Sequence, residues 1–255
     1  MSKRRLCWLL GLVLAVPAAR AVESNALYQV STISALLEGV YDGATPCAEL
    51  LRHGDFGIGT LDGLNGELII HQGRAVLAAS DGQVYPVAAT NTIPFAVITF
   101  FRPQTCRTLE NVASAADLQA RLGAGLASNY FYAICVTGRF ECVKVRSVPR
   151  QHKPYPRLAD VVRRQSIFEY RAESGVLMGF WTPVYANGIG VAGFHLHFLS
   201  ADGSKGGHLL NCRFARAEAQ SARVANFTLH LPAAAGFSAA TLDGDRATEI
   251  HTVEQ

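Results

Sequence analysis

Two histidines alternate with apolar residues in the segment Phe194–Leu199, and a third histidine follows at position 208. Consecutive side chains of a strand point to opposite faces, so this alternation predicts a strand with His195 and His197 on one face. The dipeptide Asp202-Gly203, between two apolar runs, is typical of a hairpin turn. A hairpin centred there places His208 directly opposite His197, with Cβ atoms roughly 5 Å apart. Three imidazoles would then converge, which predicts a metal site with His195, His197 and His208 as ligands.

A second explanation exists for each of these histidines. A single histidine on a strand is more often a surface residue or a hydrogen-bonded core residue than a metal ligand. Three histidines with the periodicity of one strand face favour the metal site over that explanation. Structural zinc sites usually have four protein ligands, many of them cysteine, whereas this cluster contains no cysteine. The pattern is therefore more typical of a metal with an open coordination position.

The first 21 residues have the composition of a secretory signal peptide. A basic start, Met1–Arg5, precedes an apolar run from Leu6 to Pro17, and Ala19-Arg20-Ala21 matches a small-x-small cleavage site. The apolar run is shorter than the roughly 20 residues that a membrane helix needs. We therefore expect a signal peptide at residues 1–21, a mature chain from residue 22, and a periplasmic or secreted protein with no membrane association.

Removal of this leader changes the charge of the chain. The full sequence has a formal net charge of +3, and the leader contains Lys3, Arg4, Arg5 and Arg20 but no acidic residue, so the mature chain has a charge of −1. The basic balance thus comes from the leader. We find no basic stripe or nucleic-acid motif in the remainder and expect no nucleic-acid partner.

Five cysteines remain after the leader: Cys47, Cys106, Cys135, Cys142 and Cys212. An oxidising compartment permits disulfides, but the number is odd and none of these cysteines has CxxC spacing. Cys135 and Cys142 flank Thr137-Gly138, so a disulfide within a hairpin is conceivable there. The sequence does not establish the disulfide state.

The mature chain has mostly the alternating pattern of strands, with a few short helices. We expect strands at 27–31, 56–61, 67–71, 75–79, 83–87, 96–101, 131–137, 141–148, 168–173, 175–185, 189–199, 208–215 and 227–231, and helical segments at 34–38, 47–53, 111–122 and 158–166. A turn is predicted at Gly138, and the proline-rich segment 149–156 is expected to cross between sheets. These features predict an α/β chain of the α+β type, with two mostly antiparallel or mixed β-sheets. Residues 22–255 would form one domain of two intimately packed β-rich halves.

Three charged residues have patterns that allow two interpretations. Glu67 begins a strand after a glycine-containing turn, Arg146 alternates with Lys144 on one strand face, and Glu254 is the penultimate residue. Solvated strand ends, solvent-facing charges and frayed termini are the commoner uses of such residues. Their spacing alone does not distinguish these uses from a functional one.

Longer motifs resemble those of the acetolactate decarboxylase family. They are Leu36–Gly43, Leu50–Thr60, Asn65–Leu68, Val145–Pro156, Gly179–Pro183 and Phe194–Leu199, and the resemblance covers about residues 27–254 in the same order. Carried over residue by residue, the resemblance assigns the metal ligands to His195, His197 and His208, the pocket glutamates to Glu67 and Glu254, the active-site arginine to Arg146 and a pocket threonine to Thr60. Arg150 lies in the same motif as Arg146 and is the alternative assignment for the arginine.

This resemblance implies a zinc ion, a two-sheet fold, a homodimer, and decarboxylation of (S)-2-acetolactate to (R)-acetoin and CO2 in the acetoin and butanediol pathway. Zinc would act as a Lewis acid that stabilises an enediolate. Two alternatives remain open: another three-histidine zinc enzyme of the hydrolase class, and a secreted binding protein that contains a metal.

The proton donor is not fixed by the sequence. Arg146 suits bidentate binding of a carboxylate or enediolate, and its high pKa makes it a poor acid. Burial can raise the pKa of a carboxyl group toward neutrality, so Glu67 or Glu254 is the better proton carrier on physical grounds. The family resemblance also allows the arginine itself to protonate.

Overall fold

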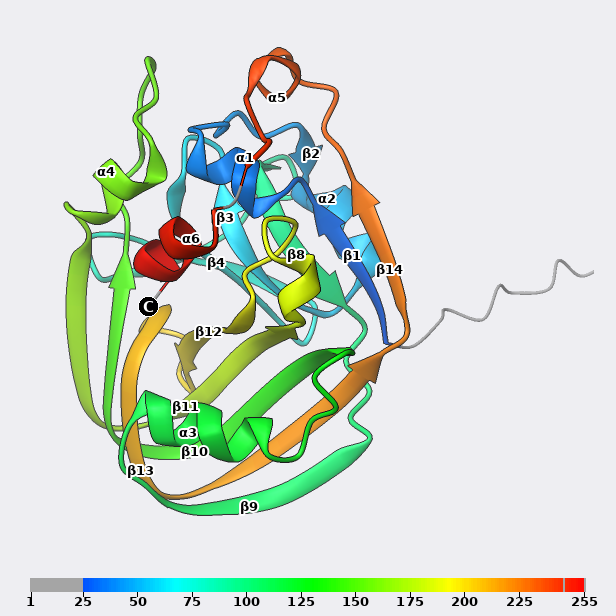
Figure 1. The fold of residues 1–255 in the computed structure, drawn as a ribbon. Helices are drawn as coiled ribbons and strands as arrows, with labels where there is room; N and C mark the ends of the chain where they lie inside the picture. Colours follow the sequence, from blue (N-terminus) through cyan, green and yellow to red (C-terminus); the bar gives the residue numbers. More distant parts are fainter. Residues whose placement is uncertain (1–24, 245, 255) are drawn as a thin grey trace, which may run out of the picture.

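The computed structural model describes residues 25–244 and 246–254. The predicted signal peptide at residues 1–21 lies outside these residues. The chain forms two main β-sheets with a few short helices, which confirms the predicted fold class. In Figure 1 one sheet occupies the upper half of the molecule and the other the lower half, with the C-terminal helix beside their junction. Among the described residues no helix is long and apolar enough to cross a membrane.

The first sheet has seven strands and contains the first and the last strand of the described chain, β1 and β14. Its strands, in spatial order, are β14 (Asn226–His230), β1 (Ala26–Val30), β8 (Phe95–Thr99), β3 (Phe56–Leu61), β4 (Asn65–His71), β5 (Arg74–Ala78) and β6 (Val84–Pro86). The pairing of β1 with β14 is parallel, and the other pairings in this sheet are antiparallel. Strands β2 (Thr45–Pro46) and β7 (Thr92–Ile93) form a separate small ribbon.

The second sheet is built from three very long strands and two shorter ones. They are β10 (Phe131–Ser147), β11 (Ser166–Thr182), β12 (Gly193–Ser200), β13 (Gly206–Val224) and β9 (Thr105–Val112). Strand β13 pairs with β12 and also with β10, so β10, β11, β12 and β13 close into a ring of antiparallel pairings. Strand β9 pairs with β13 outside this ring.

The hairpin that carries the histidines has the register expected from the sequence. His197 on β12 lies opposite His208 on β13, and Phe198 lies opposite Gly207. The hairpin closes through a hydrogen bond of 2.9 Å from the Ser200 amide to the Lys205 carbonyl. The turn therefore spans four residues around Asp202-Gly203, and the predicted alignment of His197 with His208 is confirmed.

The helices are short. They are α1 (Ile33–Leu37), α2 (Cys47–Leu50) followed by the 3-10 turn η1 (Leu51–His53), α3 (Ala115–Gly123), α4 (Leu158–Val162), the 3-10 turn η2 (Val184–Ala186), α5 (Ala235–Ala239) and α6 (Ala247–Glu254). The helix predicted at 111–122 begins later, after Ser114 caps its N-terminus by accepting a hydrogen bond from the Asp117 amide. The preceding residues belong to β9, a strand that the sequence analysis did not predict.

The turn predicted at Gly138 is wrong. Strand β10 runs without a break from Phe131 to Ser147. A Cβ atom at Gly138 would lie 2.7 Å from the Cβ of Ala217 on β13, so this glycine permits close approach of two strands instead of a turn. Cys135 and Cys142 therefore lie on one extended strand, and both are free thiols. The hairpin disulfide that their spacing made conceivable does not form.

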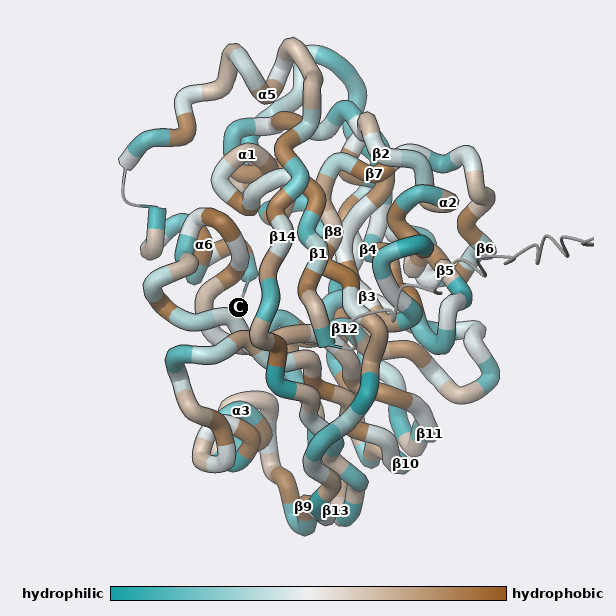
Figure 2. The backbone as a smooth tube through the Cα atoms, turned by 90° about the vertical axis from the view of Figure 1, so that its right-hand side faces the viewer, coloured by the Kyte–Doolittle hydropathy of each residue, from teal (hydrophilic) through white to brown (hydrophobic). Residues whose placement is uncertain are grey.

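The largest hydrophobic cluster lies between the two sheets and extends under helices α1, α4 and α6. It contains Leu36 from α1, Phe95 from β8, Met178 and Phe180 from β11, and Val253 from α6. Figure 2 shows hydrophobic residues along the strands of both sheets. Burial of apolar side chains from both sheets and from α6 thus fixes the C-terminal helix against the junction where the histidines lie.

Candidate metal centre and active-site pocket

The three histidines converge on one point beside the first sheet. Their ring centroids are 5.2 Å (His195–His197), 5.0 Å (His195–His208) and 5.4 Å (His197–His208) apart. One nitrogen from each ring lies within 4.8 Å of the other two. The side chains of His197 and His208 are 0% and 2% exposed, and that of His195 is 11% exposed. These three residues form a group that can bind a metal ion.

Two backbone carbonyl groups orient the buried rings. Nδ1 of His197 lies 3.2 Å from the carbonyl oxygen of Leu68, and Nε2 of His208 lies 3.0 Å from that of Glu254. The opposite nitrogens, Nε2 of His197 and Nδ1 of His208, are buried and have no hydrogen-bond partner among the described residues. Buried polar atoms are rarely left unpaired, and metal-ligating histidines usually donate their second ring N–H to a neighbouring group. The chemistry of these donors therefore fits a metal ion.

Electrostatics keep the imidazoles in the neutral form that binds metals. Burial, together with the nearby Arg146 guanidinium, lowers the pKa of His195 to about 3. Burial also lowers the pKa of His197 and of His208 well below the ordinary value. A neutral imidazole offers a lone pair, so the rings are already deprotonated for ligation at neutral pH.

Glu67 reaches the histidines from the first sheet. It follows Gly66, which has a φ of +66° and whose added Cβ would lie 2.7 Å from the Ala78 carbonyl oxygen. The Glu67 Oε2 atom lies 3.5 Å from Nε2 of His197. Burial raises the pKa of Glu67 to about 7, although Arg146 opposes the shift. Gly66 thus provides the left-handed backbone conformation that is needed just before Glu67. The buried carboxyl group of Glu67 titrates near neutrality.

Glu254 approaches the same histidines from the C-terminal helix α6. Its Oε2 lies 3.4 Å from Nε2 of His195 and 3.8 Å from Nδ1 of His208, and has no hydrogen-bond partner among the described residues. Burial raises the pKa of Glu254 to about 7, with Arg146 lowering it in part. The frayed terminus that is the usual fate of a penultimate residue is not observed here, because α6 places this carboxyl group inside the molecule.

Arg146 lies at the end of β10, directly opposite His208 in the register. Its Nη2 donates a hydrogen bond of 2.7 Å to the Val253 carbonyl oxygen and lies 3.8 Å from Oε2 of Glu254. The side chain is 5% exposed. Arg150, the alternative from the same motif, is instead half-exposed and pairs with Asp62 at 2.7 Å. The structure therefore brings Arg146, and not Arg150, to the histidines.

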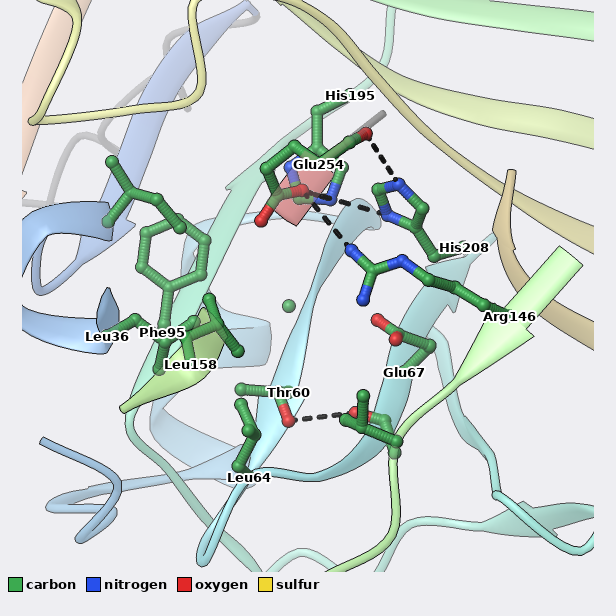
Figure 3. Close-up of a pocket in the computed structure, with 14 residues that line it drawn as sticks. Leu36, Thr60, Leu64, Glu67, Phe95, Arg146, Leu158, His195, His208 and Glu254 are labelled. Carbon is green, nitrogen blue, oxygen red and sulfur yellow. Dashed lines mark hydrogen bonds and ion pairs between the residues drawn. The ribbon is translucent and has the colours of Figure 1, made fainter. Parts of the chain in front are cut away.

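Thr60 supports the backbone of the pocket. It lies in β3 at an irregularity in the pairing of β3 with β4. Its hydroxyl donates a hydrogen bond of 2.8 Å to the carbonyl oxygen of Gly66, the residue before Glu67. Figure 3 shows this bond at the lower side of the pocket, away from the histidines. The geometry connects Thr60 with the position of Glu67.

The pocket has a charged half and an apolar half. Figure 3 shows Glu67, Arg146, His195, His208 and Glu254 on one side and hydrophobic side chains on the other. The apolar side includes Leu36, Leu64, Phe95 and Leu158, and Ile33 and Val148 also line the pocket. The cavity has a volume of about 30 Å³, which is room for roughly two water molecules.

Sequence reasoning missed this apolar wall and the backbone acceptors. Leu36, Leu64 and Phe95 come from separate elements and have the apolar character of ordinary core residues. The Leu68 and Val253 carbonyl groups have no side-chain signal at all. In contrast, the seven residues expected at the site all lie at or beside this pocket: Thr60, Glu67, Arg146, His195, His197, His208 and Glu254.

This fold and site define a class of protein: a two-sheet β-rich protein in which three neutral imidazoles form a group that can bind a metal ion. This group lies beside a pocket that is also lined by an arginine and two glutamates. Comparison with known proteins then specifies the family. A family model described as alpha-acetolactate decarboxylase matches residues 27–244. The chain belongs to the alpha-acetolactate decarboxylase family.

Individual relatives and solved structures agree with this membership. The chain is 45% identical over 241 residues to an alpha-acetolactate decarboxylase of Methanosarcina mazei, covering 94% of this chain and 84% of the relative. It is 40% identical over 230 residues to that of Bacillus subtilis, covering 89% and 90%. The crystal structure of the protein from Bacillus subtilis strain 168 superposes with a TM-score of 0.87 at 38% identity, covering 90% of this chain and 99% of that one.

Proposed function

We propose that this chain is a carboxy-lyase that decarboxylates (S)-2-acetolactate to (R)-acetoin and CO2, the reaction that supplies acetoin for butanediol formation. The observation that carries the proposal is the meeting of three imidazoles, Arg146 and two buried carboxyl groups at one pocket. The names of the relatives, alpha-acetolactate decarboxylase, support the same substrate.

Zinc is the metal that we propose for this site. His195, His197 and His208 would hold it, since zinc favours nitrogen ligands and its catalytic sites keep three protein ligands and one exchangeable position. When bound, zinc supplies a Lewis acid that withdraws electron density from the substrate carbonyl as CO2 leaves. The absence of cysteine from the cluster also favours a catalytic ion over a structural one.

Arg146 is proposed to bind the negative charge of the substrate. Its Nη2 is already committed to the Val253 carbonyl, so Nη1 and Nε are the groups that remain for the substrate. The charge of a β-keto acid moves from its carboxylate to the carbonyl oxygen when CO2 leaves, forming an enediolate. A fixed guanidinium in a site screened from water stabilises that developing charge without reorganising.

Glu67 or Glu254 is proposed to deliver the proton that completes the reaction. In the metal-free chain, burial raises the pKa of both carboxyl groups to about 7, which favours their protonated form more than in an ordinary glutamate. The two carboxyl groups approach the histidines from different elements, β4 and α6, so a proton from one of them reaches one face of a planar enediolate. Delivery from a single direction yields a single enantiomer of the product.

The apolar wall is proposed to receive the methyl groups of the substrate. Leu36, Leu64, Phe95 and Leu158 lie across the pocket from the charged groups, as Figure 3 shows. Contact with this wall would orient the substrate with its oxygen atoms toward the metal site. The same side chains exclude water, which strengthens the interactions of Arg146 and the glutamates with the reacting atoms.

We also propose that residues 1–21 are a signal peptide and that residues 22–255 act as a periplasmic or secreted homodimer, folded as one domain of two packed β-rich halves. The basic start, apolar run and small-x-small site support the leader. N-terminal sequencing of the exported protein tests the cleavage point, and sedimentation equilibrium tests the dimer. A retained leader or a monomer at micromolar concentration would contradict the corresponding part.

The activity is tested by incubating the zinc-loaded protein with racemic acetolactate and measuring CO2 and acetoin. We expect release of both, enantiomeric excess of (R)-acetoin, and loss of release after chelation. Matched samples with His197→Gln separate enzymatic from spontaneous decarboxylation. Equal release by wild type and this variant would show that the protein is not the catalyst.

A further inference from the structure

The C-terminal helix α6 is bound to the site by its last carbonyl groups. Helices end with backbone carbonyls that lack intrahelical partners. In α6, the Val253 carbonyl accepts a hydrogen bond from Arg146 at 2.7 Å, and the Glu254 carbonyl lies 3.0 Å from Nε2 of His208. The Glu254 carboxyl group lies among the same histidines. The end of α6 therefore forms part of the pocket wall.

The beginning of α6 is held by a separate group of ionic side chains, which we call the docking cluster: Glu38, Arg157, Arg246 and Glu249. Arg157 contacts Glu38 at 2.9 Å and Glu249 at 3.1 Å. Arg246 pairs with Glu38 and lies 3.4 Å from Glu249. These contacts tie α6 to the residue that follows α1 and to the residue that precedes α4.

The position of Glu254 depends on these docking contacts. Helix α6 has eight residues, fewer than the roughly 12 that an isolated helix needs for marginal stability in water. Glu249 lies five residues before Glu254, which is about 7.5 Å along the helix axis. Between them, Ile250 and Val253 are 3% and 2% exposed and pack in the main core cluster. A shift at the docking cluster would therefore move the Glu254 carboxyl group.

The charged side chains of the pocket are largely buried, and α6 covers part of them. The side chains of Glu67, Arg146, His197, His208 and Glu254 are at most 10% exposed. Release of α6 would remove Glu254 from the wall and free the Arg146 guanidinium, so this helix is the part whose movement would open the charged half of the pocket.

We propose that α6 is a lid over the metal centre, and that Arg157 and Arg246 are positioning residues that hold it closed with Glu254 at the histidines. The docking cluster lies outside the pocket and acts through the helix. The consequence for turnover rests on the proposed decarboxylase function. The consequence for lid opening and for metal exchange rests on the geometry alone.

The test uses Arg157→Met, which removes the charge, and Arg157→Lys, which keeps it. The matched control is Arg213→Met, because Arg213 pairs with Glu141 at 2.9 Å on the surface of the second sheet. Three quantities are measured on the full zinc-loaded chain: hydrogen exchange of the amides of 250–254, the rate of zinc loss to a chromogenic chelator, and kcat and KM for acetolactate.

We expect Arg157→Met to accelerate amide exchange in α6 and zinc loss by about three- to tenfold, which is the scale of partly exposed ion pairs. High salt should accelerate both rates in wild type and have less effect on the variant, because salt screens the same contacts. Arg157→Lys should keep rates close to those of wild type, and Arg213→Met should not change them. Turnover should fall mainly in kcat, since Glu254 would spend less time at the site.

Wild-type exchange and zinc-loss rates in Arg157→Met would overturn the lid, whatever the protein catalyses. Rates in Arg157→Lys equal to those of Arg157→Met would overturn the assignment of the effect to the charge of Arg157. A protein that shows the expected exchange and zinc-loss rates but no acetolactate turnover would retain the lid and lose the proposed function.

Discussion

The Nη2 atom of Arg146 donates a hydrogen bond of 2.7 Å to the carbonyl oxygen of Val253, so the arginine of the pocket also caps the C-terminal helix. A cation at a helix C-terminus is favourable because it meets the unpaired carbonyls and the negative end of the helix dipole. The same guanidinium lies 3.8 Å from the Glu254 carboxyl group. Arg146 thus links the part of the pocket that would bind substrate to the helix that closes it.

Arg146→Lys should lower kcat/KM by about 100-fold or more, the usual scale for loss of a preorganised donor. Lysine keeps the charge but has no planar group that can bind Val253 and the substrate together. Steady-state kinetics with acetolactate measure the effect. The control is Arg150→Lys, because Arg150 is half-exposed and pairs with Asp62 outside the site. Near-wild-type rates in Arg146→Lys would contradict the proposal that this side chain binds Val253 and the substrate together.

Glu254→Gln and deletion of Val253–Gln255 should have different effects. The comparison separates the role of the Glu254 carboxyl group from the role of the helix end in covering the pocket. Glutamine removes the titrating carboxyl group and leaves the carbonyl contacts to Arg146 and His208, so kcat should fall by about 10²- to 10³-fold with a stable protein. The deletion also removes those contacts and the buried Val253, so it should lower the melting temperature as well. Unchanged kinetics in both variants would remove Glu254 from the mechanism.

Metal binding should stabilise the folded chain. A ligand that binds the native state raises its stability in proportion to the logarithm of the free ligand concentration. We expect the melting temperature to rise with zinc concentration in wild type and not in His197→Gln, which lacks a central ligand. His71→Gln at the far end of β4 is the control, because His71 is not among the three clustered histidines. A zinc-dependent rise in His197→Gln equal to that of wild type would place the metal elsewhere.

The pH dependence of stability in the metal-free protein should reveal the buried Glu67. Burial raises the folded pKa of this carboxyl to about 7, whereas an unfolded glutamate titrates near 4.3. A raised folded pKa stabilises the native state fully below the unfolded pKa, and this contribution is lost as pH rises through the folded pKa. The amide of Glu67→Gln does not titrate. As pH rises from 4.5 to 7.5, wild type should therefore lose about 1–3 kcal/mol of its free energy of unfolding relative to Glu67→Gln.

Urea denaturation of both proteins with a chelator present measures this shift. The neutral histidines are common to wild type and variant, so their contribution cancels in the difference. A difference that does not change with pH would mean that Glu67 is ionised in the folded protein with an ordinary pKa.

The hairpin of His195, His197 and His208 could be predicted because its information is local. Strand periodicity places two histidines on one face, and the symmetry of residues 197 and 208 about the turn sets the third. Both depend on a few neighbouring residues and on one backbone geometry. The resemblance to the family motifs predicted that Glu67, Arg146 and Glu254 belong to the site. Their spacing in the sequence alone does not distinguish a functional role from an exposed charge.

Other features depend on contacts distant in the sequence and could not be predicted in this way. Gly138 has the local appearance of a turn, but its lack of a side chain serves the close approach of β10 to Ala217 on β13. The tail becomes the helix α6 because Ile250 and Val253 pack in the core and Arg146 and His208 bind its last carbonyls. Neither tertiary contact has a signature in the local sequence.

The central claim is that zinc held by the three histidines makes this pocket a decarboxylase, and a titration tests it most directly. Metal-free protein at known concentration is mixed with increasing zinc, and the initial rate of CO2 release from acetolactate is measured at each step. We expect the rate to rise linearly and to level off at one zinc per chain, with His208→Gln remaining inactive throughout. A full rate without zinc, or equal rates in wild type and His208→Gln, would contradict the claim.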